Sequence, residues 1–125
     1  MIKTLLSTLF ALIILFTGAI FENRFIKNEF TEFTEVLDSL YDKTQEQTAT
    51  REDVYAVQKN WLEKKRKLHA VIPHTEIKEM DLWISECVML VHDKEWTDAI
   101  SKIEVLIELS EQIPNSFTLS FQNIF

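Results

Sequence analysis

The sequence predicts an all-α protein in which an N-terminal transmembrane helix continues into an antiparallel up-down four-helix bundle. An uncharged apolar run occupies residues 5–21. Beyond it, apolar residues recur at alternating steps of three and four, which is the spacing of amphipathic helices. The 125 residues include one glycine and two prolines, which are too few to mark a series of hairpin turns.

The apolar run 5–21 is interpreted as a membrane span, and residues 1–21 as an uncleaved signal anchor. Its length of about 17 residues is at the short end of what crosses a hydrocarbon core of roughly 30 Å. A helix satisfies every backbone polar group in that environment. The residues expected to hold the anchor in lipid are Leu5, Leu9, Leu12, Leu15, Phe16 and Phe21.

Cleavage and orientation of the anchor remain open from the sequence. Lys3 before an apolar run is also typical of a secretory signal peptide, and residues 17–19 form a weak cleavage site. Retention is favoured because the apolar run continues to residue 21. Arg24 and Lys27 balance Lys3 across the run, so the distribution of basic residues does not fix orientation. We expect a single-pass protein of the cell membrane with an extracytoplasmic bundle.

Residues 22–116 are predicted to form the bundle, and its first helix covers about 22–44. Its apolar seam consists of Ile26, Phe30, Phe33, Leu37 and Leu40. This is a heptad pattern, and we interpret its phenylalanines as core residues. No helix breaker separates the seam from the apolar run. One continuous helix is therefore expected from the anchor into the bundle.

The second helix is predicted at about 51–71. Thr50 and Asp53 have the spacing of a capping box, with aspartate in place of the usual glutamate. The apolar stripe of this helix consists of Val54, Val57, Trp61, Leu68 and Ile72. Pro73 disfavours helical geometry in the residue before it, so the helix is expected to end there.

A basic cluster interrupts this stripe. Its members are Lys64, Lys65, Arg66 and Lys67. Short connections make consecutive helices antiparallel, so the cluster is expected near the bilayer, opposite Glu29 and Glu32. It could attract anionic lipid headgroups. Ion pairing with the two glutamates on a solvated face is the preferred interpretation.

The third and fourth helices are predicted at about 75–92 and 94–113. Thr75 and Asp93 are their expected N-caps. Cys87 falls on the apolar seam of the third helix and is expected to be a buried, inert thiol. Pro114 is expected to end the fourth helix.

Residues 117–125 then form a partly alternating apolar tail. Such a tail folds onto the bundle, touches lipid or docks on another protein. Its candidate contacts with a partner are Phe117, Leu119, Phe121, Ile124 and Phe125.

No pattern in the sequence predicts catalysis, a cofactor or a metal. His69, His74 and His92 lack ligand spacing, and the bundle topology separates the third from the other two. There is no phosphate-binding glycine loop and no recognisable nucleophile arrangement. The 20 acidic residues exceed the 13 basic ones, so nucleic acid is not an expected partner. We therefore expect a protein that is not an enzyme.

The chain resembles a family of small single-span bacterial membrane proteins that is catalogued as a domain of unknown function. The resemblance covers nearly the whole chain. It rests on the single span, the Trp61 helix, residues 72–74, residues 93–96 with Ala99, and residues 123–125. It implies an anchored helical protein of Gram-positive, often spore-forming bacteria, sometimes encoded beside a polytopic membrane protein. It implies no catalytic residue.

Two functions are compatible with these observations. The first is a membrane-anchored accessory or scaffold protein whose bundle and tail bind an integral membrane partner. The alternative is an extracytoplasmic module that binds a small molecule or lipid in a pocket between helices, lined by Trp61, Trp83 and Trp96. The sequence does not predict the oligomeric state.

Overall fold

The computed structural model describes residues 1–124, with the side chains of residues 1–116. This part of the chain contains helices and no strand, which confirms the all-α prediction. The four helices are α1 (Ile2–Gln45), α2 (Arg51–Leu68), α3 (His74–His92) and α4 (Trp96–Ile124).

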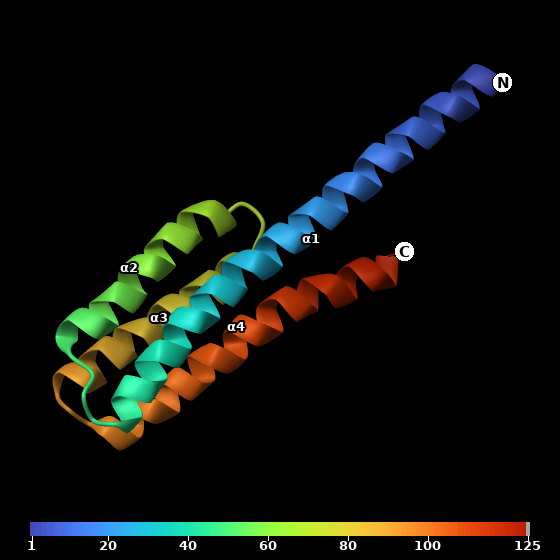
Figure 1. Cartoon of the computed structure of the whole chain (residues 1–125). Coiled ribbons are helices and arrows are strands. Elements are labelled where there is room, and N and C mark those ends of the chain that lie inside the picture. The colour runs from blue at the N-terminus through green and yellow to red at the C-terminus, as the bar shows by residue number, and fades with distance from the viewer. Residues whose placement is uncertain (125) are drawn as a thin grey trace.

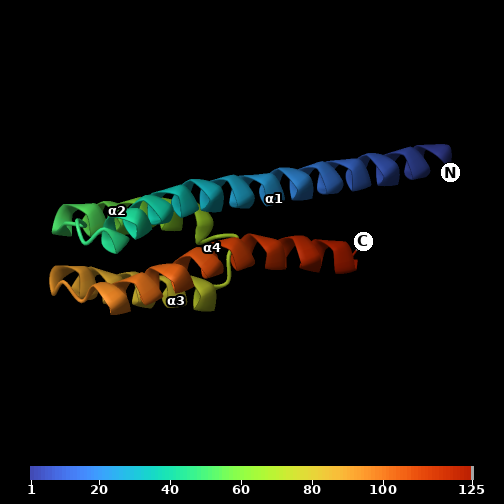
Figure 2. The same ribbon diagram turned by 60° about the horizontal axis from the view of Figure 1, so that its bottom comes forward.

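The helices pack as an up-down bundle, as predicted. α1 packs against α2 and α4, and α3 packs against the same two helices from the opposite corner. Successive helices run in opposite directions (Figure 1, Figure 2). The α2–α3 turn therefore lies at the end of the bundle from which the first half of α1 projects, and the other two turns lie at the far end.

The core is built from the seams that the sequence predicts. Every seam residue named for the first helix is buried, and so are the stripe residues of the second helix. Trp61 lies in the centre, with its ring 6.3 Å from that of Phe30 and 5.5 Å from that of Phe33. Burying one side chain of this size contributes about 1.5–3 kcal/mol, so the phenylalanine seam holds α1 firmly in the bundle.

α1 and α3 end in the same backbone motif. Gln47 and Lys94 adopt left-handed conformations, with φ of 62° and 59°. The Thr48 amide donates to the Lys43 carbonyl at 2.8 Å, and the matching bond after α3 runs from the Glu95 amide to the Leu90 carbonyl at 2.9 Å. These are Schellman motifs, which satisfy the last carbonyls of a helix and reverse the chain.

The second Schellman motif corrects the predicted start of the fourth helix. Asp93 is the C-cap of α3 and not the N-cap of α4, because the left-handed Lys94 separates the two helices. α4 begins at Trp96, and the Ala99 amide donates to the Glu95 carbonyl at 2.9 Å.

The α2–α3 turn also differs from the expectation. α2 ends at Leu68 and not at residue 71, because the amides of Val71 and Ile72 both donate to the Leu68 carbonyl and tighten the chain into a turn. Thr75 is not an N-cap. Pro73 takes that position, since its φ of −55° and ψ of 140° direct the chain into a helix that begins one residue later.

The predicted helix end at Pro114 is wrong. α4 continues through this proline to Ile124 and is bent in Figure 2. A proline inside a helix removes one amide donor and crowds the preceding turn, which bends a helix without requiring it to stop. The predicted tail is therefore helical as far as Ile124. The side chains of Phe117, Leu119, Phe121 and Ile124, and the whole of Phe125, lie outside the described residues.

Candidate functional site

The first half of α1 projects from the bundle as an apolar helix (Figure 1). This segment, residues 5–21, is long and apolar enough to cross a membrane, and none of it is buried against the rest of the protein. Each predicted anchor residue is exposed: Leu5, Leu9, Leu12, Leu15, Phe16 and Phe21. We call residues 5–21 the apolar segment.

A charged cluster joins α1 to α2 just beyond the apolar segment. Lys64 is 6% exposed, although it carries a charge. Its Nζ lies 2.7 Å from Oε2 of Glu29 and donates a hydrogen bond to Glu32. Lys67 Nζ lies 3.5 Å from the other oxygen of Glu29. The structure thus places part of the basic cluster against the two glutamates that the helix register indicated.

Lys64 and Glu32 change each other's pKa. Burial lowers the pKa of Lys64, but hydrogen bonds to Glu29 and Glu32 outweigh burial and leave that pKa above its ordinary value. The hydrogen bond from Lys64 lowers the pKa of Glu32 in return. Lys64 and Glu32 therefore stabilise one another in their charged forms.

A second polar network joins α2 to α3. The indole N–H of Trp61 donates to Oδ1 of Asp81 at 2.7 Å, and Lys65 Nζ donates to Oδ2 of the same aspartate, also at 2.7 Å. Asp81 therefore fixes both the central tryptophan and a lysine of the basic cluster. Sequence reasoning gave no such role to Asp81.

The side chains of the basic cluster thus have three different environments. Lys64 and Lys67 pair with α1, Lys65 pairs with α3, and Arg66 is exposed. Arg66 lines a groove of about 500 Å³ at the end of the bundle nearest the apolar segment. This groove, which we call the α2–α3 groove, is lined by Leu62, Lys65, Arg66, His69, His74 and Ile77.

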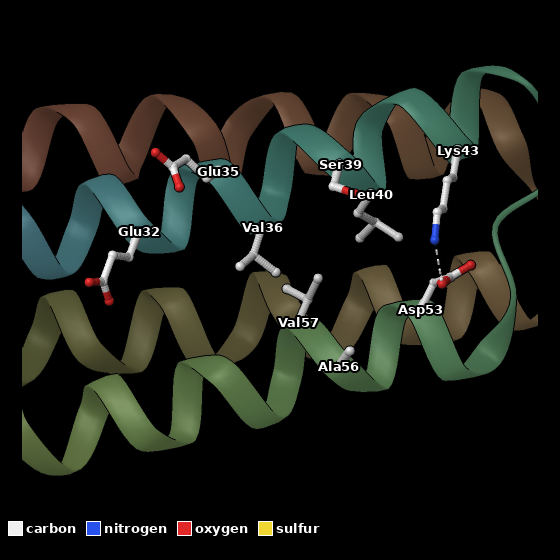
Figure 3. A pocket seen from close by; sticks show the side chains of 9 residues that line it. All are labelled: Glu32, Glu35, Val36, Ser39, Leu40, Lys43, Asp53, Ala56 and Val57. Atoms are coloured by element: carbon white, nitrogen blue, oxygen red, sulfur yellow. Dashed lines mark hydrogen bonds and ion pairs between the residues drawn. The ribbon is translucent and has the colours of Figure 1, made fainter.

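Another groove, of about 340 Å³, lies between α1 and α2 (Figure 3). Val36 and Val57 point toward one another across it. The ion pair of Lys43 and Asp53, at 2.9 Å, lies at one end of the groove, and Glu32 lies at the other. The N-terminal capping box of α2 supports this pair, because Asp53 also accepts the Thr50 amide.

The three tryptophans lie in different surroundings. Trp61 is buried in the core. Trp83 is half-buried on α3, with Lys102 Nζ 4.4 Å from its ring centroid. Trp96 is half-buried at the far end, beside a groove that Val91 also lines.

Residues 1–124 contain no group of three or more potential metal ligands. His69 and His74 share the α2–α3 groove, whereas His92 lies at the end of α3, with Nδ1 3.2 Å from Asp93. Cys87 is buried, and burial raises its pKa to about 12. A thiol in that environment is a poor nucleophile at neutral pH.

These features define a class of protein: a four-helix bundle led by an exposed apolar helix. A family model described as "Domain of unknown function (DUF4363)" matches residues 20–124, and the chain belongs to that family. The matched region begins at the end of the apolar segment and includes the whole bundle. Searches of curated proteins and of solved structures gave no match.

Proposed function

We propose that the protein is a non-enzymatic accessory or scaffold protein, anchored in a membrane by the apolar segment, that binds an integral membrane partner. The observation that carries this proposal is α1 itself. One uninterrupted helix has an apolar half that is not buried in the protein and a second half that contributes to the core of the bundle. An apolar surface of this size needs a cover, and a bilayer provides one along its full length.

The finer expectations belong to the same proposal. The bundle would lie on the extracytoplasmic side of a single-pass protein in the cell membrane. The resemblance described above supports a bacterial origin, in Gram-positive and often spore-forming species. The charge of −7 fits a bundle that stays soluble beside the membrane and does not bind nucleic acid.

Two surfaces are available for a partner. Tyr55 and Leu62 on α2, and Leu82 and Met89 on α3, are exposed large apolar residues, and each pair has heptad spacing. Heptad-spaced apolar residues suit packing against a further helix. The end of α4 gives the second surface, because it runs back along α1 toward the apolar segment (Figure 1).

The test is purification of the tagged full-length protein from native membranes in mild detergent, with mass spectrometry of what accompanies it. The expected result is a stoichiometric integral membrane protein and an intact mass that includes residues 1–21. A variant lacking residues 117–125 should lose that partner and keep the helical circular dichroism of the bundle. Release of the full-length chain from membranes by alkaline carbonate would contradict the anchor.

The alternative function, a binding module that uses a pocket lined by tryptophans, has less support. The indole of Trp61 is buried, and its N–H already binds Asp81. Tryptophan fluorescence during titration with metabolite and lipid panels separates the two functions. An accessory protein should give a flat response, whereas a saturable change would favour the pocket.

A further inference from the structure

The α2–α3 groove combines basic and apolar side chains in a protein that is otherwise acidic. Arg66 and the imidazoles of His69 and His74 supply hydrogen-bond donors, while Leu62 supplies exposed apolar surface and Ile77 closes the groove from the core. The ring of His69 is held in place by a bond between Nδ1 and the Arg66 carbonyl at 2.8 Å. These donors suit a phosphate group.

The start of α3 lies beside the groove, and Glu76 in its first turn offsets part of the positive potential of the helix end. Helix α3 begins at His74, and its N-cap Pro73 makes no side-chain hydrogen bond to the first turn. The positive end of a helix dipole attracts phosphate groups. Asp81 offsets the charge of Lys65 in part, so Arg66 is the main cation of the site.

The position of the groove along α1 indicates the source of the phosphate. Glu29, which binds Lys64, lies about 12 Å along the helix axis from the end of the apolar segment. Measured along α2, His69 lies about 7 Å closer to the apolar segment than Lys64 does. The end of the groove formed by His69 and Arg66 is therefore roughly 5–9 Å beyond residue 21, whereas Leu62 is roughly 15 Å beyond it. A headgroup layer is about 5–7 Å thick on each side of the hydrocarbon core.

We propose that the α2–α3 groove binds the phosphate headgroup of an anionic phospholipid in the leaflet next to the bundle. This inference rests on the proposed membrane anchor. Arg66, Lys65 and His69 bind the phosphate oxygens. The bound lipid holds the α2–α3 turn on the membrane surface and prevents the bundle from tilting away from it.

The test is native mass spectrometry of the full-length protein in detergent micelles with added dioleoyl phosphatidylglycerol or dioleoyl phosphatidylcholine. Phosphatidylglycerol should be retained preferentially. Lys65→Gln with Arg66→Gln should weaken its retention roughly tenfold. The matched control is Arg51→Gln with Lys59→Gln, which removes the same charge from the first half of α2, further from the groove, and should retain the lipid. Arg66→Gln with His69→Gln repeats the test without changing the Lys65–Asp81 pair.

Equal retention of the two lipids by the wild-type protein would overturn the headgroup site. An equal loss of bound phosphatidylglycerol in the groove variants and the control variant would overturn it too. Displacement of phosphatidylglycerol by excess inorganic phosphate would assign the groove to free phosphate instead. Carbonate extraction of the same variants keeps the two proposals apart. Variants that lose the lipid should stay in the membrane pellet, whereas release of the wild-type chain would contradict the anchor.

Discussion

Lys64 shows how a charge can be kept inside a small bundle. An isolated ammonium group in an apolar environment loses several kcal/mol of hydration. Here that loss is offset by two carboxylates, of which Glu29 is 12% exposed and Glu32 is 67% exposed. The two glutamates are not equivalent, because only Glu32 keeps most of its contact with water.

This asymmetry predicts the outcome of a mutant cycle. Lys64→Met should lower the free energy of unfolding by about 3 kcal/mol, because it removes the buried cation beside Glu29 and leaves that carboxylate only the exposed Lys67 at 3.5 Å. Glu29→Gln with Lys64→Met should return within about 1 kcal/mol of wild type, because no buried charge then remains. Urea unfolding of the full chain in detergent, followed by circular dichroism, measures both.

Lys67→Met is the matched control for this cycle. Lys67 is 56% exposed and lies 3.5 Å from Glu29, so its loss should cost about 0–1 kcal/mol. A cost for Lys67→Met as large as that for Lys64→Met would show that burial is not the deciding factor.

The left-handed residues Gln47 and Lys94 give a second prediction at this scale. Glycine adopts positive φ without a steric cost, so Gln47→Gly and Lys94→Gly should each stabilise the protein by about 0.5–1 kcal/mol. Glu46→Gly and Asp93→Gly, one residue earlier with φ of −76° and −83°, should destabilise it by a similar amount. The melting temperatures of the four variants test this prediction. Higher melting temperatures for all four variants would contradict it.

At the scale of elements, the sequence predicts the existence and packing faces of the helices better than their ends. Heptad seams are repeated several times, so the faces of α1 and α3 are well determined by residues such as Phe33 and Ile84. The capping box of α2 is confirmed because its signal lies in Thr50 and Asp53 alone. The caps predicted at Thr75 and Asp93 are wrong because backbone conformations at neighbouring residues decided those ends.

Candidate site residues show the same limit. The register predicted that Lys64 would lie opposite Glu29 and Glu32, since antiparallel helices fix which turns meet. Asp81 was missed because an acidic residue beside a core position has the same pattern as any solvated one. Only the crossing of α2 and α3 brings it to both Trp61 and Lys65.

The α1–α2 interface predicts a dependence of stability on acid. The Thr50 amide and Lys43 lower the pKa of Asp53 below its ordinary value of 3.8, and Lys64 lowers the pKa of Glu32 below its ordinary value of 4.5. A carboxyl whose folded pKa is depressed stabilises the fold above its unfolded pKa and loses that contribution as the pH falls through the folded value. Stability should therefore begin to fall below about pH 4.5.

Asp53→Asn tests this dependence. Its loss of stability between pH 7 and about pH 3 should be smaller than that of wild type, because one of the depressed carboxyls is absent. Glu52→Gln, at the neighbouring exposed position, should lose as much stability as wild type over the same pH range. Urea midpoints at the two pH values measure the effect, and identical losses in Asp53→Asn and wild type would refute it.

At the scale of the whole molecule, the continuity of α1 sets the rotation of the bundle relative to the apolar segment. Inserting two alanines after Glu22 turns one part against the other by about 200°. The bundle core begins at Ile26, so its fold and melting temperature should be unchanged. Capture of the proposed membrane partner should be lost, because the exposed faces of α2 and α3 would then point away from it.

Two matched insertions make this a test of rotation. Seven alanines restore the rotation to within about 20° but raise the bundle by roughly 10 Å. Two alanines placed in the exposed turn at Glu46 change the sequence by the same amount without altering the junction. Partner capture that survives the insertion after Glu22 would show that rotation is not important.

α1 also acts as a lever. The part of it beyond the apolar segment is about 36 Å long and is stiffened by packing against α2 and α4. If the apolar segment tilts by about 10° in the bilayer, the far turns of the bundle move sideways by roughly 6 Å, which is more than one helical pitch. A change in membrane thickness that alters this tilt would therefore move the far end of the bundle sideways relative to a neighbouring protein. The fold of the bundle would not change.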